Sequence, residues 1–352
     1  MTLTAPTRTP ASHARPRRTL RLGPVSTTYH RRALVVPVLV LLLLVLVAAL
    51  SLGRGDYPIS VPGVLGTLVG AGEDTARFIV LELRAPRIAV AVLVGLALGI
   101  SGALIQTFAR NPLASPDVLG VTGGAAIGAV AVIVAGGGTT AVGALGGLVM
   151  AGLIFGLAWQ SGIDGYRLVL VGVGLSAMAQ AVVSYLLTRS ALFDAAAANV
   201  WLTGSLNGRG WDQARPLAIA LLVLLPAALA MTRVLNVLQF GDETARALGV
   251  RVPLAQLAVV GVAVGLAAFA VSAAGPIQFV ALVVPQIAVR LTGGSRPPLL
   301  ASGLLGALLL TASDLVARTA LPETFPVGVV TAVVGAPYLL WLLVRGRRRS
   351  TL

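Results

Sequence analysis

Residues 84–128 read RAPRIAVAVLVGLALGISGALIQTFARNPLASPDVLGVTGGAAIG, and this stretch decides the fold. Arg84 and Arg87 flank a proline, and an apolar run follows them as far as Phe108. A polar turn at 110–117 then leads into a second apolar run that is rich in glycine and alanine. Apolar runs of about 20 residues joined by a short turn are typical of helices that span a membrane. Small residues at helical spacing allow such helices to pack closely.

The composition of the whole chain argues against an ordinary soluble domain. Of its 352 residues, 57% are hydrophobic and 11% are charged, and the mean hydropathy is +0.93. Long charge-free runs in such a chain indicate spanning helices. The chain contains no cysteine, so a disulfide framework and a thiolate metal site are both excluded.

No recognisable catalytic motif occurs in the sequence. A Walker A sequence, an HExxH pair and a nucleophile elbow are absent, and the two histidines, His13 and His30, lie in the basic leader. We therefore expect no catalytic residue, no metal site and no cofactor in this chain.

The net charge of +14 is concentrated at the two ends of the chain. Residues 1–33 contain seven arginines and no acid, and the tail contains four more arginines. Basic segments beside apolar helices are expected of cytoplasmic termini, and anionic membrane lipids would attract them. Nucleic-acid binding is not expected, because no folded basic face or aromatic platform is visible. We predict a disordered basic cytoplasmic leader at 1–32, a transmembrane domain at 33–345 and a basic cytoplasmic tail at 346–352.

Apolar runs bounded by charge, proline or glycine predict about ten spanning helices. An even number places both termini on one side, as the arginine-rich ends require. The first run is longer than the roughly 7–15-residue core of a signal peptide, so an uncleaved helix is favoured over a cleaved signal. The runs lie near 33–52, 87–108, 118–136, 140–159, 166–188, 215–234, 253–274, 277–290, 299–318 and 326–344.

The eighth run, 277–290, is too short for an ordinary span. At 1.5 Å per residue its roughly 14 residues extend about 21 Å, less than a hydrocarbon core of about 30 Å. Pro285 also interrupts it. Such a segment is tolerated where protein shields it or where it lines a cavity, although a tilted, kinked helix is the alternative.

No carboxylate occupies the middle of any apolar run, which argues against a self-energised transporter. Carboxylates or broken-helix carbonyls at mid-membrane are typical of secondary transporters. Asp314 and Arg318 lie four residues apart near the end of the ninth run and can pair on one helical face. The absence of carboxylates from the middle of the runs favours a pore whose energy is supplied from outside this chain.

Four further motifs, taken with the opening stretch, resemble the FecCD-type permeases of ABC importers for iron–siderophore complexes, haem and cobalamin. The resemblance covers roughly residues 34–345, with RxPR at 84–87 and RNPLA at 110–114 in the family's order. The other matching stretches are WLTGSL at 201–206, GDETARALGV at 241–250, GPIQFVALVVP at 275–285 and PVGVVTAVVGAP at 326–337.

The resemblance implies an all-α polytopic membrane fold like that of the cobalamin importer permease, located in the cell membrane. It implies a permease of an ATP-driven importer, with ATP hydrolysis on a separate ATPase chain and delivery by an extracytoplasmic solute-binding protein. A homodimer, or a heterodimer with a related permease, would form the pore. The expected cargo is a metal chelate, foremost an Fe(III)–siderophore. The alternatives are haem, cobalamin, bare Zn or Mn ions, an ion-coupled secondary transporter, or a membrane scaffold without transport.

The resemblance also assigns roles to particular residues. The loop at 241–250 is expected to dock in a cleft of the ATPase, and arginines at the outer ends of two helices are expected to pair with glutamates of the binding protein. The shortness of the eighth run suggests residues that border the pathway. The ATPase-coupling residues are Gly241, Glu243, Ala245, Leu248 and Gly249, the docking residues are Arg84, Arg87 and Arg318, and the pathway candidates are Gln106, Gln278 and Pro276.

This chain departs from the family pattern at one turn. Gln286 stands where the family has a histidine, Ala281 stands where glycine is common, and the 293–297 turn reads GGSRP. We expect these departures to affect the contact with the ATPase more than the fold.

Overall fold

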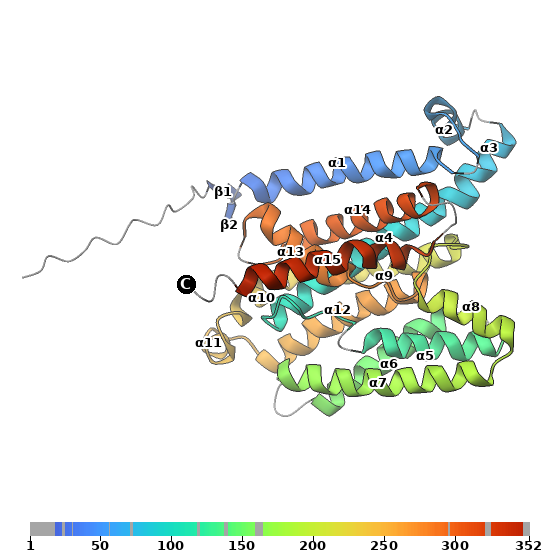
Figure 1. Cartoon of the computed structure of the whole chain (residues 1–352). Helices are drawn as coiled ribbons and strands as arrows, with labels where there is room; N and C mark the ends of the chain where they lie inside the picture. Colours follow the sequence, from blue (N-terminus) through green and yellow to red (C-terminus); the bar gives the residue numbers. More distant parts are fainter. Residues whose placement is uncertain are drawn as a thin grey trace, which may run out of the picture.

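The computed structural model describes residues 18–22, 25–29, 31–55, 57–70, 73–117, 120–136, 140–158, 165–294, 296–320 and 325–347. The described part is an elongated bundle of helices (Figure 1). In chain order they are α1 (Arg31–Gly53), α2 (Val61–Leu68), α3 (Asp74–Phe78), the π-helix η1 (Ile79–Arg84), α4 (Ala85–Phe108), α5 (Val121–Val134), α6 (Thr140–Ala158), α7 (Gly165–Arg189), α8 (Leu192–Leu202), α9 (Trp211–Ala230), α10 (Thr232–Leu238), α11 (Asp242–Ala247), α12 (Val252–Ala274), α13 (Val280–Thr292), α14 (Leu299–Thr319) and α15 (Val327–Arg347).

Each of the ten predicted apolar runs coincides with a helix, so the all-α membrane fold is confirmed. Among the described residues, six helices are long and apolar enough to cross a membrane. The other four runs form the shorter apolar helices α5, α6, α13 and α15. α13 has 13 residues and contains Pro285, as the short eighth run predicted. The sequence patterns did not predict α8, which lies at one end of the bundle (Figure 1).

The two ends of the bundle carry different elements (Figure 1). α1 begins and α15 ends at the same end, which also carries α10 and α11; we call it the terminal end. The opposite end, which we call the far end, carries α2, α3 and α8. This arrangement agrees with an even number of crossings.

Three helices form the centre of the bundle. α4, α12 and α14 are mostly buried, whereas α1, α7 and α9 expose most of their apolar side chains, as expected of helices that face lipid. Glycines allow the central backbones to touch: a Cβ atom on Gly95 or Gly306 would fall within 3.0 Å of the other residue's carbonyl oxygen. Close approach of this kind drives helix association where no water is present.

Part of the leader forms two short strands, whereas its composition suggested disorder. Strand β1 (Arg18–Leu22) pairs antiparallel with β2 (Val25–Tyr29), with Arg18 opposite Tyr29. The strands contain β-branched residues and lie beside a Gly-Pro pair at 23–24, which is a hairpin signal that a composition argument overlooks. α1 begins at Arg31, two residues before the predicted boundary at 33. The remaining leader positions and residues 348–352 of the predicted tail lie outside the described residues.

Candidate functional site

Arg84, at the far end, is tied to its own chain. Its side chain is 8% exposed, and it donates hydrogen bonds to the carbonyl oxygens of Leu52 at 2.7 Å and Tyr57 at 2.6 Å. The carbonyls in the last turn of a helix lack partners within that helix, and a cation is favoured there. Arg84 therefore holds the end of α1 against the start of α4.

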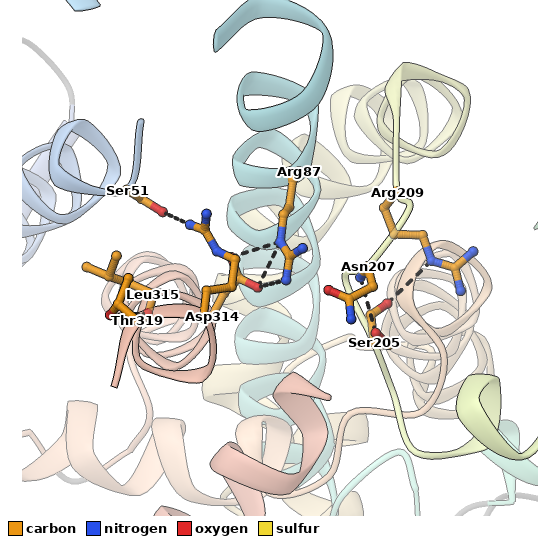
Figure 2. Close-up of polar contacts among 9 residues, drawn as sticks. Ser51, Arg87, Ser205, Asn207, Arg209, Asp314, Leu315 and Thr319 are labelled. Carbon is orange, nitrogen blue, oxygen red and sulfur yellow. Dashed lines mark hydrogen bonds and ion pairs between the residues drawn. The ribbon is translucent and has the colours of Figure 1, made fainter. Parts of the chain in front are cut away.

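Arg87 and Arg318 share one buried carboxylate (Figure 2). Arg87 donates to both oxygens of Asp314, the shortest contact being 2.7 Å, and Arg318 Nε lies 3.1 Å from Oδ2. Arg318 also donates to the hydroxyl of Ser51 on α1. The expected pairing of Asp314 with Arg318 is therefore present. The shared carboxylate is buried, since Asp314 is 1% exposed. The structure brings the three predicted docking arginines to one end, where each has an intramolecular partner.

The family-like stretches at 201–206, 275–285 and 326–337 meet at one junction of the fold. The Ser205 amide donates to Ala274 at 2.9 Å, and the Gly328 amide donates to Gly204 at 3.1 Å. Gly275 has φ 77°, which glycine adopts readily, and its missing Cβ allows the Trp201 carbonyl to approach. Segments far apart in sequence therefore form one compact corner between α8, α12 and α15.

Two of the pathway candidates lie at this corner. Gln278 is exposed and Pro276 is half-buried, in the extended segment between α12 and α13. Phe279 follows with φ 68°, an uncommon value for a residue with a side chain. Arg209 lies in the loop between α8 and α9 and donates to the Ser205 carbonyl at 3.3 Å (Figure 2). Burial lowers the pKa of the Arg209 guanidinium.

The third pathway candidate, Gln106, faces a neighbouring helix and not open space. It is 4% exposed, and its amide nitrogen donates to Leu282 O at 2.8 Å and Ala281 O at 3.5 Å. Pro285 has no N–H group, so the Ala281 carbonyl has no partner four residues later. Gln106 therefore binds the backbone where proline interrupts α13. Its own carbonyl accepts a hydrogen bond from Gln286 at 2.6 Å.

The predicted coupling loop forms the short helix α11 at the terminal end (Figure 1). Gly241 at φ 102° precedes it, and Gly249 at φ 82° closes it. The Val250 amide donates to Ala245 O at 2.9 Å, which is the six-to-one bond of a glycine-terminated helix. Glycine adopts these positive φ angles readily, so Gly241 and Gly249 set the two ends of α11.

The side chains of the coupling loop point in different directions. Leu248 is 63% exposed, and Glu243 is exposed as well. Ala245 is fully buried and packs against Leu238 and Val252 of its own chain. Direct contact between Ala245 and a docked subunit is therefore not available in this conformation, whereas Leu248 presents an apolar surface.

Sequence reasoning missed Arg110, which follows the end of α4. It has φ 50° at the position after the helix cap, where glycine is usual. The Asn111 amide closes the helix by donating to Gln106 O at 3.2 Å. A left-handed conformation costs a residue with a side chain about 1–2 kcal/mol. The sequence signal for this unusual conformation was that an arginine follows the apolar helix at the position where glycine is usual.

The Arg110 side chain reaches the coupling loop. Its guanidinium donates to Leu238 O at 2.6 Å and lies 3.3 Å from Oδ1 of Asp242, the first residue of α11. The other carboxylate oxygen of Asp242 accepts from Gln256 of α12 at 3.2 Å. Gln256 is 4% exposed. Asp242 thus joins α11 to both α12 and the turn after α4.

The residues that the structure describes offer no cluster of His, Cys, Asp and Glu that could hold a metal ion. Their polar networks join helices to one another and carry no nucleophile paired with a base. The geometry is that of a helical membrane bundle with the short helix α11 at one end and a buried ionic cluster at the other.

Comparison with known proteins supports this architecture. The ferric enterobactin transport system permease protein FepG of Escherichia coli (strain K12) is 41% identical over 92% of this chain and 99% of that protein. The achromobactin transport system permease protein CbrC of Dickeya dadantii (strain 3937) is 39% identical over 86% of this chain and 88% of that protein. The cobalamin import system permease protein BtuC of Halobacterium salinarum is 40% identical over 77% of this chain and 74% of that protein.

A solved structure described as an inward-facing conformation of a metal-chelate type ABC transporter superposes with a TM-score of 0.79. It is 31% identical and covers 88% of this chain and 99% of that chain. A sequence profile of the FecCD transport family matches residues 41–345, a range that begins within α1 and ends within α15. The family consists of ABC transporter permease subunits, which are transporters and not enzymes. This chain therefore belongs to the FecCD transport family.

Proposed function

We propose that this chain is the permease of an ATP-driven importer that carries an Fe(III)–siderophore chelate into the cytoplasm. The identity to the ferric enterobactin permease, 41% over nearly the whole length of both chains, is the observation that carries the substrate class. Relatives named for achromobactin and for Fe(3+)-citrate import point to the same class. The chain would supply the pore, and a separate ATPase would hydrolyse ATP.

The two ends of the bundle would bind different partners. The terminal end would face the cytoplasm, because α1 begins and α15 ends there, and the segments next to them in the sequence are rich in arginine, which is retained on the cytoplasmic side. The coupling residues Gly241, Glu243, Leu248 and Gly249 would then dock on the ATPase, with Ala245 packing the loop from behind. The far end would meet the solute-binding protein.

The pore would lie between two copies of the chain, or between this chain and a related permease. Gln278 and Pro276 would border the pathway near its outer mouth. Arg84, Arg87 and Arg318 would contribute positive charge to the docking face. Because their guanidinium groups already bind Leu52, Tyr57 and Asp314, we propose that they attract an acidic binding protein through their field and do not need to leave these partners.

Uptake of labelled iron tests the function. The gene would be deleted, and import of ⁵⁵Fe bound to a tris-catecholate, a hydroxamate and citrate would be measured, followed by complementation with the wild-type chain. At least one iron chelate should depend on the chain and on ATP. Dependence of cobalamin, haem, Zn or Mn uptake alone would favour the corresponding alternative. Uptake that persists without ATP and follows an ion gradient would identify a secondary transporter.

A further inference from the structure

Arg110 has an unfavourable backbone conformation, because it lies directly after the C-cap residue of α4. It follows the last turn of α4 at φ 50°, where a glycine would fit without strain. The neighbouring Asn111 also fixes the turn, because its Oδ1 accepts from the Leu113 amide at 2.9 Å. The chain therefore has an arginine where the backbone favours glycine. Such strain is retained where the side chain does something that glycine cannot.

The side chain of Arg110 joins the ends of two short helices. The Leu238 carbonyl lies at the end of α10, and a carbonyl at that position lacks a partner within its helix. Asp242 is the first residue of α11. One guanidinium thus reaches the end of the first helix and the beginning of the second, across the turn at 239–241.

The same carboxylate is held from a second direction. Gln256 of α12 is buried and donates to Asp242 Oδ2. α4 and α12 are the two most buried helices of the bundle. Through Arg110 and Gln256, the carboxylate of Asp242 is connected to both of them. The exposed Leu248 lies on the same loop, six residues further along the chain.

We propose that Arg110 is a positioning residue that couples movement of the α11 loop to α4. This inference rests on the proposed function, in which the ATPase docks on that loop. When the ATPase displaces α11, the contacts of Arg110 with Leu238 O and Asp242 move the end of α4 with it. Arg110 is about half exposed here, at 49% of its side chain, and a docked ATPase would exclude water from the contact and strengthen it. Docking and ATP hydrolysis do not require Arg110, whereas their conversion into transport does.

The test compares three variants in proteoliposomes that contain the full permease–ATPase complex and its binding protein. Arg110→Gly removes the side chain and the strain, Arg110→Ala removes the side chain and keeps the strain, and Arg110→Lys keeps the charge. Arg251→Gln is the matched control, because Arg251 is an exposed arginine near the same loop whose side chain forms no hydrogen bond or ion pair with the described residues. The readouts are ATPase association, ATP hydrolysis and ⁵⁵Fe–chelate imported per ATP.

The Gly and Ala variants should retain association and hydrolysis and import about tenfold less chelate per ATP, a typical size for coupling between two sites. The Lys variant should recover part of the ratio, and the Arg251 control should match the wild type. An unchanged ratio in both the Gly and Ala variants would overturn the proposal. So would loss in the Ala variant alone, because strain would then be the cause. Failure of the wild-type chain to bind an ATPase or import any chelate would instead overturn the proposed function.

Discussion

The guanidinium of Arg87 on α4 binds both carboxylate oxygens of Asp314 on α14, which lie 227 residues away in the sequence. Arg318 binds the same carboxylate from the next turn of α14. One carboxylate therefore balances two arginines, and the cluster keeps a net positive charge. Because the carboxylate is almost completely buried, its removal would leave two arginines without their shared partner.

Replacing Asp314 with alanine should therefore destabilise the protein strongly. Removing one member of a buried ion pair typically costs about 3–5 kcal/mol. Arg318→Gln is the matched comparison, since it preserves the Arg87–Asp314 pair and should cost much less. Thermal unfolding of the purified variants in one detergent would rank them. Equal midpoints for Asp314→Ala and the wild type would contradict a structural role for this carboxylate.

Leu248 and Ala245 should respond differently to substitution, because only Leu248 is exposed. Leu248→Ala should weaken association with the ATPase while leaving the unfolding midpoint of the permease unchanged. Ala245→Arg should lower that midpoint, because a long charged side chain cannot fit beside Leu238 and Val252. Leu222→Ala is the control, since Leu222 is also an exposed leucine and lies on α9, away from the coupling loop. Normal ATPase affinity of Leu248→Ala would exclude this contact.

The positions of the spanning helices could be predicted from the sequence, whereas the burial of individual residues could not. Long apolar runs give the helices, because the membrane requires about 20 such residues per crossing. Hydropathy does not tell which face of a helix packs inward, so Ala245 was expected at a partner surface and lies in the core. Gln106 was expected in the pathway and instead contacts Gln286, which is 180 residues away.

The strained and capping residues were also beyond sequence patterns. A backbone angle such as that of Arg110 or Phe279 follows from tertiary contacts, because the local preference of both residue types opposes it. By contrast, Gly241 and Gly249 bracket α11 at positive φ, which glycine adopts at little cost. The backbone conformation of a residue can be predicted from the sequence where its local preference agrees with the structure.

Cysteine substitution can map access to the corner between α12 and α13. The chain has no cysteine of its own, so each introduced thiol reports one site. Gln278→Cys should react in intact cells with a membrane-impermeant maleimide, because Gln278 is exposed and lies toward the outer mouth in the proposed orientation. Gln106→Cys should be protected, because Gln106 is buried between helices. Labelling of Gln106→Cys but not of Gln278→Cys would reverse the assignment of the pathway.

The contact of Gln106 with α13 should contribute measurably to stability. Gln106→Leu leaves the Ala281 and Leu282 carbonyls without their side-chain donor, and a buried unsatisfied group costs about 1–3 kcal/mol. Gln286→Leu removes only the donor to Gln106 and should cost less. The two single variants and the double variant form a thermodynamic cycle measured by thermal unfolding. Strict additivity would indicate that the two amides do not interact.

The stability of the protein should fall as the pH rises from 3.8 toward about 7, because of Asp117. This residue lies in the turn between α4 and α5, and burial raises the pKa of its carboxyl group from 3.8 to about 7. Between these two values the folded protein holds a proton that the unfolded chain has released. Stability is therefore greatest at the acidic end of this window and is lost as the pH rises toward 7.

Asp117→Asn should remove this pH dependence, since an amide resembles the protonated carboxyl group and does not titrate. The variant should unfold at a higher temperature than the wild type at pH 8, and the difference should be smaller at pH 5, which lies nearer the lower end of the window from 3.8 to about 7. Glu243→Gln is the matched control, because it makes the corresponding acid-to-amide change at an exposed position on α11. Thermal midpoints measured from pH 5 to pH 8 in one detergent would decide the matter. A wild-type midpoint that rises with pH over this range, with the same rise in Asp117→Asn, would show that the Asp117 carboxyl group is ionised in the folded protein.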